Sequence, residues 1–115
     1  MTKKILWLSR HSILPSQFKE LKRIFGSDLE VFQDPRPFDD ARDIVKRFRE
    51  GGYDEIVAVA PLSVIQRLTE LGIRPLWAEM KVCDPEEAET TVSGRPYKFV
   101  KFKRIKAIKV EFEDL

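Results

Sequence analysis

The sequence holds one cysteine, Cys83, and one histidine, His11, and it contains no asparagine. A lone cysteine excludes an internal disulfide, so a reducing, cytoplasmic location is expected. Zinc sites draw on several His and Cys side chains, so this pair excludes a His/Cys metal cluster, and we expect no metal and no cofactor. The lack of asparagine beside abundant Lys, Arg and Glu favours a thermophilic source.

Long apolar runs are also missing, and none approaches the roughly 18 residues that a membrane-spanning helix needs. The start of the chain, residues 1–8, is basic and then apolar over only four residues, which is short for a signal peptide. The chain is 43% hydrophobic and 35% charged, with a formal net charge of +2. These values predict a single soluble domain over residues 1–115, with no membrane association.

Two phosphate-binding motifs are absent as well. The sequence contains neither a GxxxxGK[ST] loop nor a GxGxxG dinucleotide fingerprint. Any phosphate site must therefore be built in another way.

The first 80 residues alternate between apolar runs typical of buried strands and segments with helical spacing of apolar residues. Pro15 suits a first helical position, Gly26 the left-handed cap of the same helix, and Ser63 an N-cap. Strand and helix alternation predicts an α/β fold with a Rossmann-like parallel sheet, for which we expect the order 2-1-3-4. The expected strands are residues 5–8, 29–33, 55–60 and 75–80, and the expected helices are 15–25, 39–50 (beginning at Asp39 or Asp40) and 63–71.

The last third of the chain has another character. Residues 81–94 read as an acidic loop, because 84–89 contain four acids and no base. Residues 95–115 carry seven bases against three acids, a local charge of +4. Within them, residues 97–102 and 105–112 read as two strands, which predicts a C-terminal antiparallel β extension or an arm across a dimer partner.

In open parallel sheets, ligands bind beyond the carboxyl ends of the strands, where the strand order reverses. With the order 2-1-3-4, Ser9, Arg10 and His11 lie at that point. Arg can bind a phosphate with two hydrogen bonds, His can move a proton near neutral pH, and the next helix offers its N-terminal amides to an anion. The triplet therefore suits a phosphate ester, although Arg10 paired with a surface carboxylate and His11 bonded within its loop explain it equally well.

Three further features have structural explanations beside functional ones. Ser63 could donate to a ligand from the facing loop, but N-capping alone accounts for it. Trp7 and Trp77 are more typical of core or interface than of stacking platforms. The basic C-terminal stripe could bind a polyanion, but such stripes more often protect a sheet edge from aggregation.

A short apolar strand, Leu6–Leu8, is followed by Ser9-Arg10-His11, then by Pro15, a helix with Gln17, and Gly26. This pattern resembles the small single-domain CRISPR-associated ring nucleases, relatives of the CARF (CRISPR-associated Rossmann fold) domains. The strand at 55–60 and the segment 72–76 are similar as well. The resemblance covers about residues 4–80 and leaves residues 84–115 unexplained, and Ser12-Ile13-Leu14 departs from the Thr-Pro that family members carry.

The resemblance implies a homodimer of antiviral defence that binds a cyclic oligoadenylate across its two-fold axis. It further implies metal-independent cleavage, in which a ribose 2′-hydroxyl attacks the adjacent phosphorus and leaves a cyclic phosphate. Arg10 and His11 would be catalytic, and Ser9 and Gln17 would contact the ligand. Ser63 is added from its position alone.

Two alternatives to a ring nuclease stay open. The chain could be a non-enzymatic nucleic-acid-binding protein of a virus or mobile element, with Lys101, Lys103 and Arg104 as phosphate contacts. It could also be a structural dimerisation module in which His11 is incidental.

Overall fold

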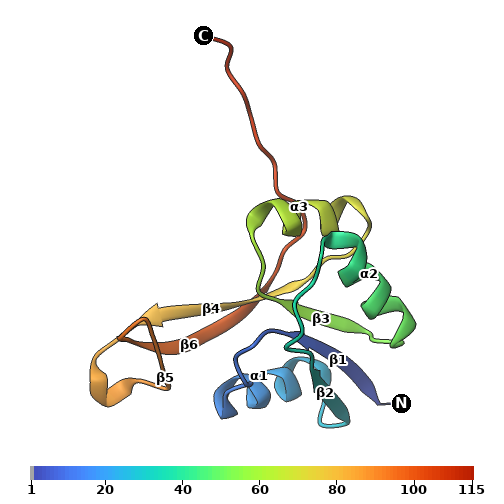
Figure 1. Cartoon of the computed structure of the whole chain (residues 1–115). Helices are drawn as coiled ribbons and strands as arrows, with labels where there is room; N and C mark the ends of the chain where they lie inside the picture. The colour runs from blue at the N-terminus through green and yellow to red at the C-terminus, as the bar shows by residue number, and fades with distance from the viewer. Residues whose placement is uncertain (1) are drawn as a thin grey trace.

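The computed structural model describes residues 2–115 and contains one six-stranded sheet with the order β2-β1-β3-β4-β6-β5 (Figure 1). The first four strands are parallel, which confirms the predicted order 2-1-3-4, and β6 adds antiparallel to β4. The strands are β1 Lys3–Leu8, β2 Leu29–Gln33, β3 Glu55–Ala58, β4 Leu76–Val82, β5 Thr90–Val92 and β6 Arg95–Arg104. The fold is therefore α/β and Rossmann-like, with a C-terminal antiparallel extension.

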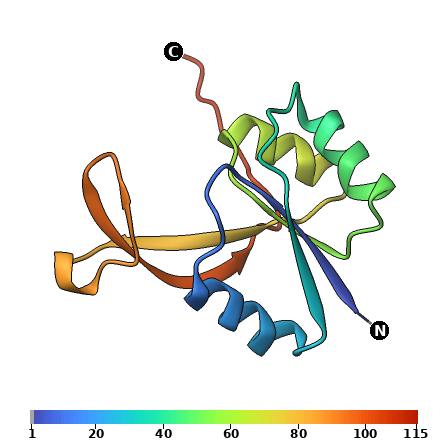
Figure 2. The same cartoon turned by 60° about the horizontal axis from the view of Figure 1, so that its bottom comes forward.

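Three helices connect the parallel strands and cover both faces of the sheet (Figures 1 and 2). Helix α1, Pro15–Phe25, packs against the face that carries Ile5, Trp7 and Val57. Helices α2, Ala41–Glu50, and α3, Leu62–Glu70, cover the opposite face, which carries Leu6, Leu8 and Ile56. Side chains alternate along a strand, so a stretch buried on both faces must be apolar throughout, as residues 5–8 of β1 are.

Of three expected helix ends, one forms as expected, one in part and one differently. Asp40 caps α2, and its carboxylate accepts a hydrogen bond from the Asp43 amide at 3.0 Å, a contact worth about 1 kcal/mol. Gly26 ends α1 at φ 94° but with ψ 165°, so it has the positive φ expected but not the left-handed helical conformation. The N-cap of α3 is Pro61, so the prediction of Ser63 as N-cap is wrong, because the helix starts before Ser63 and includes it in its first turn.

Two predictions about the C-terminal third are wrong. Residues 81–94 are not an unstructured loop, because they hold a 3-10 turn at Pro85–Glu87 and the strand β5. Ser93 and Gly94, with φ of 51° and 77°, form the tight turn between β5 and β6. A Ser-Gly turn after β-branched residues was the signal for this hairpin.

Residues 105–112 form no strand. The Ile105 amide donates to the Pro75 carbonyl at 2.9 Å, and Ile105 and Ile108 then pack on the α2–α3 side of the core. The β4 edge is already filled by β6, and no strand edge is available where the chain crosses α3, so the alternating pattern of this segment stays unpaired.

The paired strands β4 and β6, with β5, project from the body, and the C-terminal segment extends away beyond α3 (Figures 1 and 2). The radius of gyration is 15.3 Å, whereas a compact domain of this length has about 13 Å. Among the described residues, no helix has both the length and the apolar character needed to cross a bilayer.

Candidate functional site

A hollow of about 350 Å³ lies at the carboxyl ends of β1, β2 and β3. Its wall contains the triplet Ser9, Arg10 and His11 after β1, and Val59 after β3. The loop after β2, residues 34–38, closes the remaining side. This is the edge at which the crossovers from β1 and β3 diverge to opposite sides, so the hollow occupies the position where ligands bind in this fold class.

Hydrogen bonds hold the backbone of the triplet in place. The Ser9 hydroxyl oxygen accepts from the His11 amide at 3.0 Å, and the Ser9 carbonyl accepts from Gln33 Nε2 at 3.2 Å. The indole Nε1 of buried Trp7 donates to the His11 carbonyl at 2.9 Å. The loop is therefore bonded to buried Trp7 on one side and to the end of β2 on the other, and this fixes the places from which the side chains emerge.

Unlike the backbone of this loop, the side chains of Arg10 and His11 are not held by hydrogen bonds to described residues. Both residues are exposed, and neither side chain makes a hydrogen bond or ion pair with any residue of 2–115. The structural explanation offered for Arg10 was an ion pair with a surface carboxylate, and the described part of the chain contains no such pair. Both side chains are available to an external ligand.

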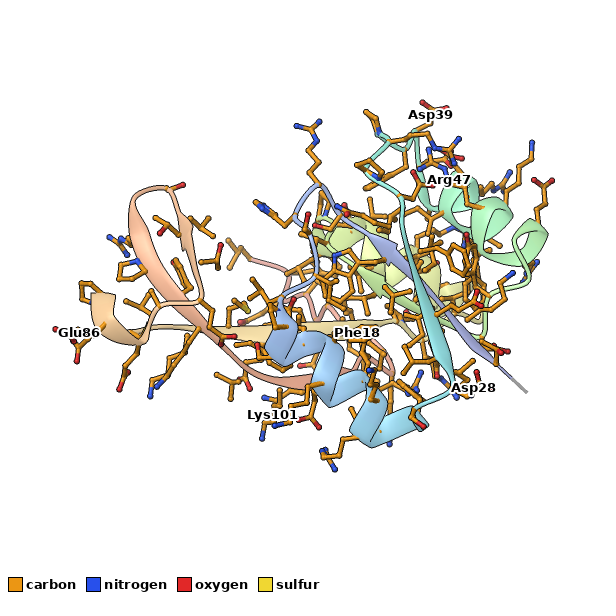
Figure 3. All side chains as sticks on the ribbon, turned by 90° about the horizontal axis from the view of Figure 1, so that it is seen from below. Phe18, Asp28, Asp39, Arg47, Glu86 and Lys101 are labelled. Atoms are coloured by element: carbon orange, nitrogen blue, oxygen red, sulfur yellow. The ribbon has the colours of Figure 1, made fainter. Side chains whose placement is uncertain are left out.

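A second cation lies across the hollow, in the loop after β2. Arg36 donates from Nε and Nη2 to the carboxylate of Asp34 at 2.9 and 2.8 Å. These hydrogen bonds lower the pKa of Asp34 to about 2, so this carboxylate is ionised throughout the neutral range. Arg47 of α2 reaches the same carboxylate at 3.5 Å and donates to the carbonyls of Arg36 and Pro37. Figure 3 shows Arg47 near this loop, which its guanidinium braces.

Sequence reasoning did not single out Arg36 as a site residue. The signal was the Pro-Arg-Pro sequence at the end of a strand next to β1, because two prolines stiffen a loop and fix the direction of the residue between them. The pair of Arg36 with Asp34 leaves Nη1 of Arg36 without a hydrogen bond to a described residue.

A second, smaller hollow of about 130 Å³ lies on the α1 side and shares Ser9, His11 and Val59 with the first. Gln17 lines it but is itself buried. Gln17 Oε1 accepts from the Leu14 amide at 2.8 Å, and its Nε2 donates to Met80 Sδ at 3.6 Å. These bonds give Gln17 a role in holding the start of α1, and its contact with a ligand remains a prediction.

Ser63 lies apart from the triplet. It is exposed in the first turn of α3 and lines neither hollow. A ligand contact by Ser63 remains a prediction that this geometry does not favour. Within residues 2–115, no three His, Cys, Asp or Glu side chains come together in a group that could hold a metal ion.

The N-terminus of α1 already has an anionic neighbour. The Ser16 hydroxyl donates to the carboxylate of Glu89, whose other oxygen accepts from the Phe99 amide at 2.8 Å. A carboxylate in this position is favourable because the N-terminal end of a helix is partly positive. We expected the N-terminal amides of α1 to bind a phosphate. The Glu89 carboxylate would compete with that phosphate for this end of the helix.

Comparisons with known proteins add no further information on the site. No family model matches the chain, and the searches of curated proteins and of solved structures gave no match either.

Proposed function

We propose that the hollow at the strand ends binds a phosphate ester. The observation that carries this proposal is the position of Arg10 and His11, two unpartnered polar side chains in the wall of the hollow at the topological switch point. A guanidinium binds phosphate oxygens through paired hydrogen bonds, and a second guanidinium, that of Arg36, lies in the same wall. Apolar Phe38 and Val59 supply the kind of surface against which the organic part of an ester packs.

The ester that the sequence pattern favours is a cyclic oligoadenylate, and the reaction is opening of the ring. The ribose 2′-oxygen attacks the adjacent phosphorus as the bond from phosphorus to the 5′-oxygen breaks. The products are a 2′,3′-cyclic phosphate and a free 5′-hydroxyl, so the proton that leaves the 2′-hydroxyl is balanced by one delivered to the 5′-oxygen. Because the substrate supplies its own nucleophile, the protein needs only to align it and stabilise charge.

Each residue of the triplet has a role in that reaction. Arg10 stabilises the developing charge on the phosphoryl oxygens. The imidazole of His11, which is not committed to an internal hydrogen bond, transfers a proton. The Ser9 hydroxyl oxygen accepts the His11 amide but keeps its own proton to donate to phosphate or ribose.

The test is incubation of the purified protein with cyclic tri-, tetra- and hexa-adenylate in the presence of a chelator, followed by chromatography of the products. Linear products that end in a cyclic phosphate are expected. His11→Ala should reduce the rate at least about a hundredfold, in line with the usual contribution of a proton-transferring side chain, and Arg10→Ala should weaken both binding and cleavage. Ser27→Ala is the control, because Ser27 is exposed before β2 and lines neither hollow, and it should leave the rate unchanged.

The possible results test the reaction, the ligand and the site separately. If the rings bind with an Arg10-dependent affinity but stay intact, the phosphate-ester site stands and the cleavage reaction is wrong. If no ring binds and none is cut, cyclic oligoadenylate is the wrong ligand. If Arg10→Ala and His11→Ala bind as the unsubstituted protein does, the hollow is the wrong site.

A further inference from the structure

The ribbon formed by β4 and β6 has two chemically different faces. Its register pairs Trp77 with Lys103, Glu79 with Lys101 and Lys81 with Lys98. Because paired residues point to the same side of an antiparallel ladder, these six residues share one face, called here the lysine–tryptophan face. On the other face, Phe102 packs edge-on against Trp7 at 6.2 Å, under α1.

The lysine–tryptophan face is open. Trp77 is 45% exposed, although tryptophan is usually well covered, and Lys81, Lys101 and Lys103 are exposed. Trp77 is not part of the apolar core that lies beneath α2 and α3. An indole ring and a row of ammonium groups therefore share one accessible surface. The strands that carry them project from the body of the molecule (Figure 2).

The charge on this face is strongly of one sign, because it carries four lysines and a single acid, Glu79. Lys103 pairs with Glu79 at 3.1 Å and lies 5.7 Å from the centre of the Trp77 ring. Lys98 pairs with Glu87 at 3.1 Å, and both partners are partly exposed. Such surface pairs contribute little and yield readily to a phosphate.

Lys81 and Lys101 make no ion pair with any residue of 2–115. Figure 3 shows Lys101 pointing outward from the ribbon and Glu86 at its far end, where Asp84, Glu86 and Glu87 limit the cationic surface.

Arg104 does not belong to this surface. Its guanidinium donates from Nη1 and Nη2 to the carboxylate of Glu55, both at 2.8 Å, and from Nη1 to the Arg74 carbonyl at 3.0 Å. It is therefore committed to joining β6 to β3. Among the bases expected from the sequence to contact nucleic acid, Lys101 and Lys103 lie on the open face and Arg104 does not.

We propose that the lysine–tryptophan face binds single-stranded nucleic acid. The ammonium groups of Lys81, Lys98, Lys101 and Lys103 contact successive phosphates, and Trp77 stacks on an unpaired base. A cationic surface combined with exposed aromatic side chains is what proteins use to bind single strands without reading their sequence. A duplex would satisfy the lysines, but its bases are already stacked and would leave Trp77 unused. This function is independent of the hollow at the strand ends.

The first experiment measures the salt dependence of binding. Fluorescence anisotropy of labelled 20-nucleotide oligothymidylate and oligouridylate should show binding that weakens steeply with sodium chloride, and a duplex of equal length should bind more weakly. The double variant Lys81→Gln/Lys101→Gln should lower the slope of log K against log salt by about 1.4, or about 0.7 for each phosphate that the variant no longer neutralises. The matched control is Arg42→Gln/Lys46→Gln on α2, which removes the same charge from another exposed surface and should leave the slope nearly unchanged.

The second experiment isolates the stacking interaction. Trp77→Ala should weaken binding of oligothymidylate about tenfold or more at fixed salt, whereas Trp77→Phe should retain most of the affinity. Oligothymidylate should also quench the tryptophan fluorescence of the unsubstituted protein, and the Phe variant, in which only buried Trp7 remains, should show no such quenching.

Four results would overturn the proposal. They are an unchanged salt slope in the lysine variant, an unchanged affinity in Trp77→Ala, duplex bound as tightly as single strand, and binding to phosphatidylserine-containing vesicles without binding to oligonucleotides. His11→Ala leaves the lysine–tryptophan face intact and should bind oligothymidylate normally. Failure here is thus distinguishable from failure of the phosphate-ester site.

Discussion

At the scale of single residues, Asp34 is an ion-pair centre rather than a catalytic acid. Its side chain is 12% exposed and lies between Arg36 and Arg47. Because its pKa is held near 2, it cannot donate a proton at neutral pH. Its contribution is to orient the loop of Arg36 at the border of the hollow, and this contribution depends on its charge.

Asp34→Asn should therefore change the pH dependence of stability. The folded-state pKa lies below the ordinary value of 3.8, so the ion pairs stabilise the fold above about pH 4, and this stabilisation is lost as the pH falls toward 2. The shift corresponds to about 1–2 kcal/mol, the lower figure allowing for solvent screening. Urea unfolding at pH 7, 4 and 2 should show that the variant is less stable at pH 7 and loses less than the unsubstituted protein between pH 4 and 2.

Glu50→Gln serves as the control, since Glu50 is an exposed carboxylate of α2 that makes no ion pair among the described residues. It should retain the full acid sensitivity of the unsubstituted protein. An Asp34→Asn protein with the same pH dependence as the unsubstituted chain would show that the pair with Arg36 is not formed in solution.

At the scale of elements, the polar contact between α1 and the hairpin of β5 and β6 is made by Glu89, beside the apolar packing of Phe102 under α1. Glu89 accepts from the Ser16 hydroxyl at the start of α1 and from the Phe99 amide of β6, and its own amide donates to the Tyr97 carbonyl at 2.9 Å. The three-residue strand β5 has a single neighbour in the sheet, so few other contacts hold it. Glu89 thus links the start of α1 to this hairpin, which is otherwise attached through the ladder of β6 with β4.

Glu89→Gln should loosen the hairpin without unfolding the sheet. The variant keeps the shape of the side chain but removes the charge that interacts with the N-terminus of α1, at a cost of about 0.5–1 kcal/mol. Amide hydrogen exchange should become faster in β5 and stay unchanged in β1 and β3. Glu86→Gln, in the neighbouring 3-10 turn, makes no such contact and should leave exchange in β5 as it was; equal protection of β5 in both variants would contradict the linking role of Glu89.

The elements that could be predicted from sequence are those whose signal is local or whose burial is complete. Strands β1 and β2 and helix α1 follow from apolar runs, spacing and Pro15. Residues 105–112 show the limit, because their alternation is real but a strand also needs a free edge, and edge availability is a property of the whole sheet. Ser63 is not the N-cap of α3 because the helix begins one residue before it, at Leu62.

At the scale of the whole molecule, the parallel sheet with helices on its faces was predictable, because short crossovers of this length are right-handed. The order 2-1-3-4 was assumed, since right-handed crossovers also permit other orders, and the structure confirms it. The order placed Ser9, Arg10 and His11 at one edge before any side chain was positioned. It could not supply Arg36, whose approach to the hollow depends on the path of the loop after β2. Nor could it separate Lys101 and Lys103 from Arg104, because the expected strand ended at residue 102, whereas β6 continues to Arg104 and places consecutive residues on opposite faces.

The last expectation concerns how many chains form one site. Each chain supplies one histidine and, in the triplet, one unpartnered arginine, whereas a cyclic oligoadenylate presents several equivalent phosphates around a ring. A two-fold pair of chains would place two triplets around one ring, so we expect a dimer of 27 kDa, twice the 13.5 kDa of the chain, by light scattering. Titration calorimetry should then give one ring for every two chains, and His11→Ala should keep both the dimeric mass and this ratio, since it removes a reacting group and not the interface. A mass of 13.5 kDa with one ring for each chain would mean that a single triplet forms the complete site, and the shared two-fold site would be wrong.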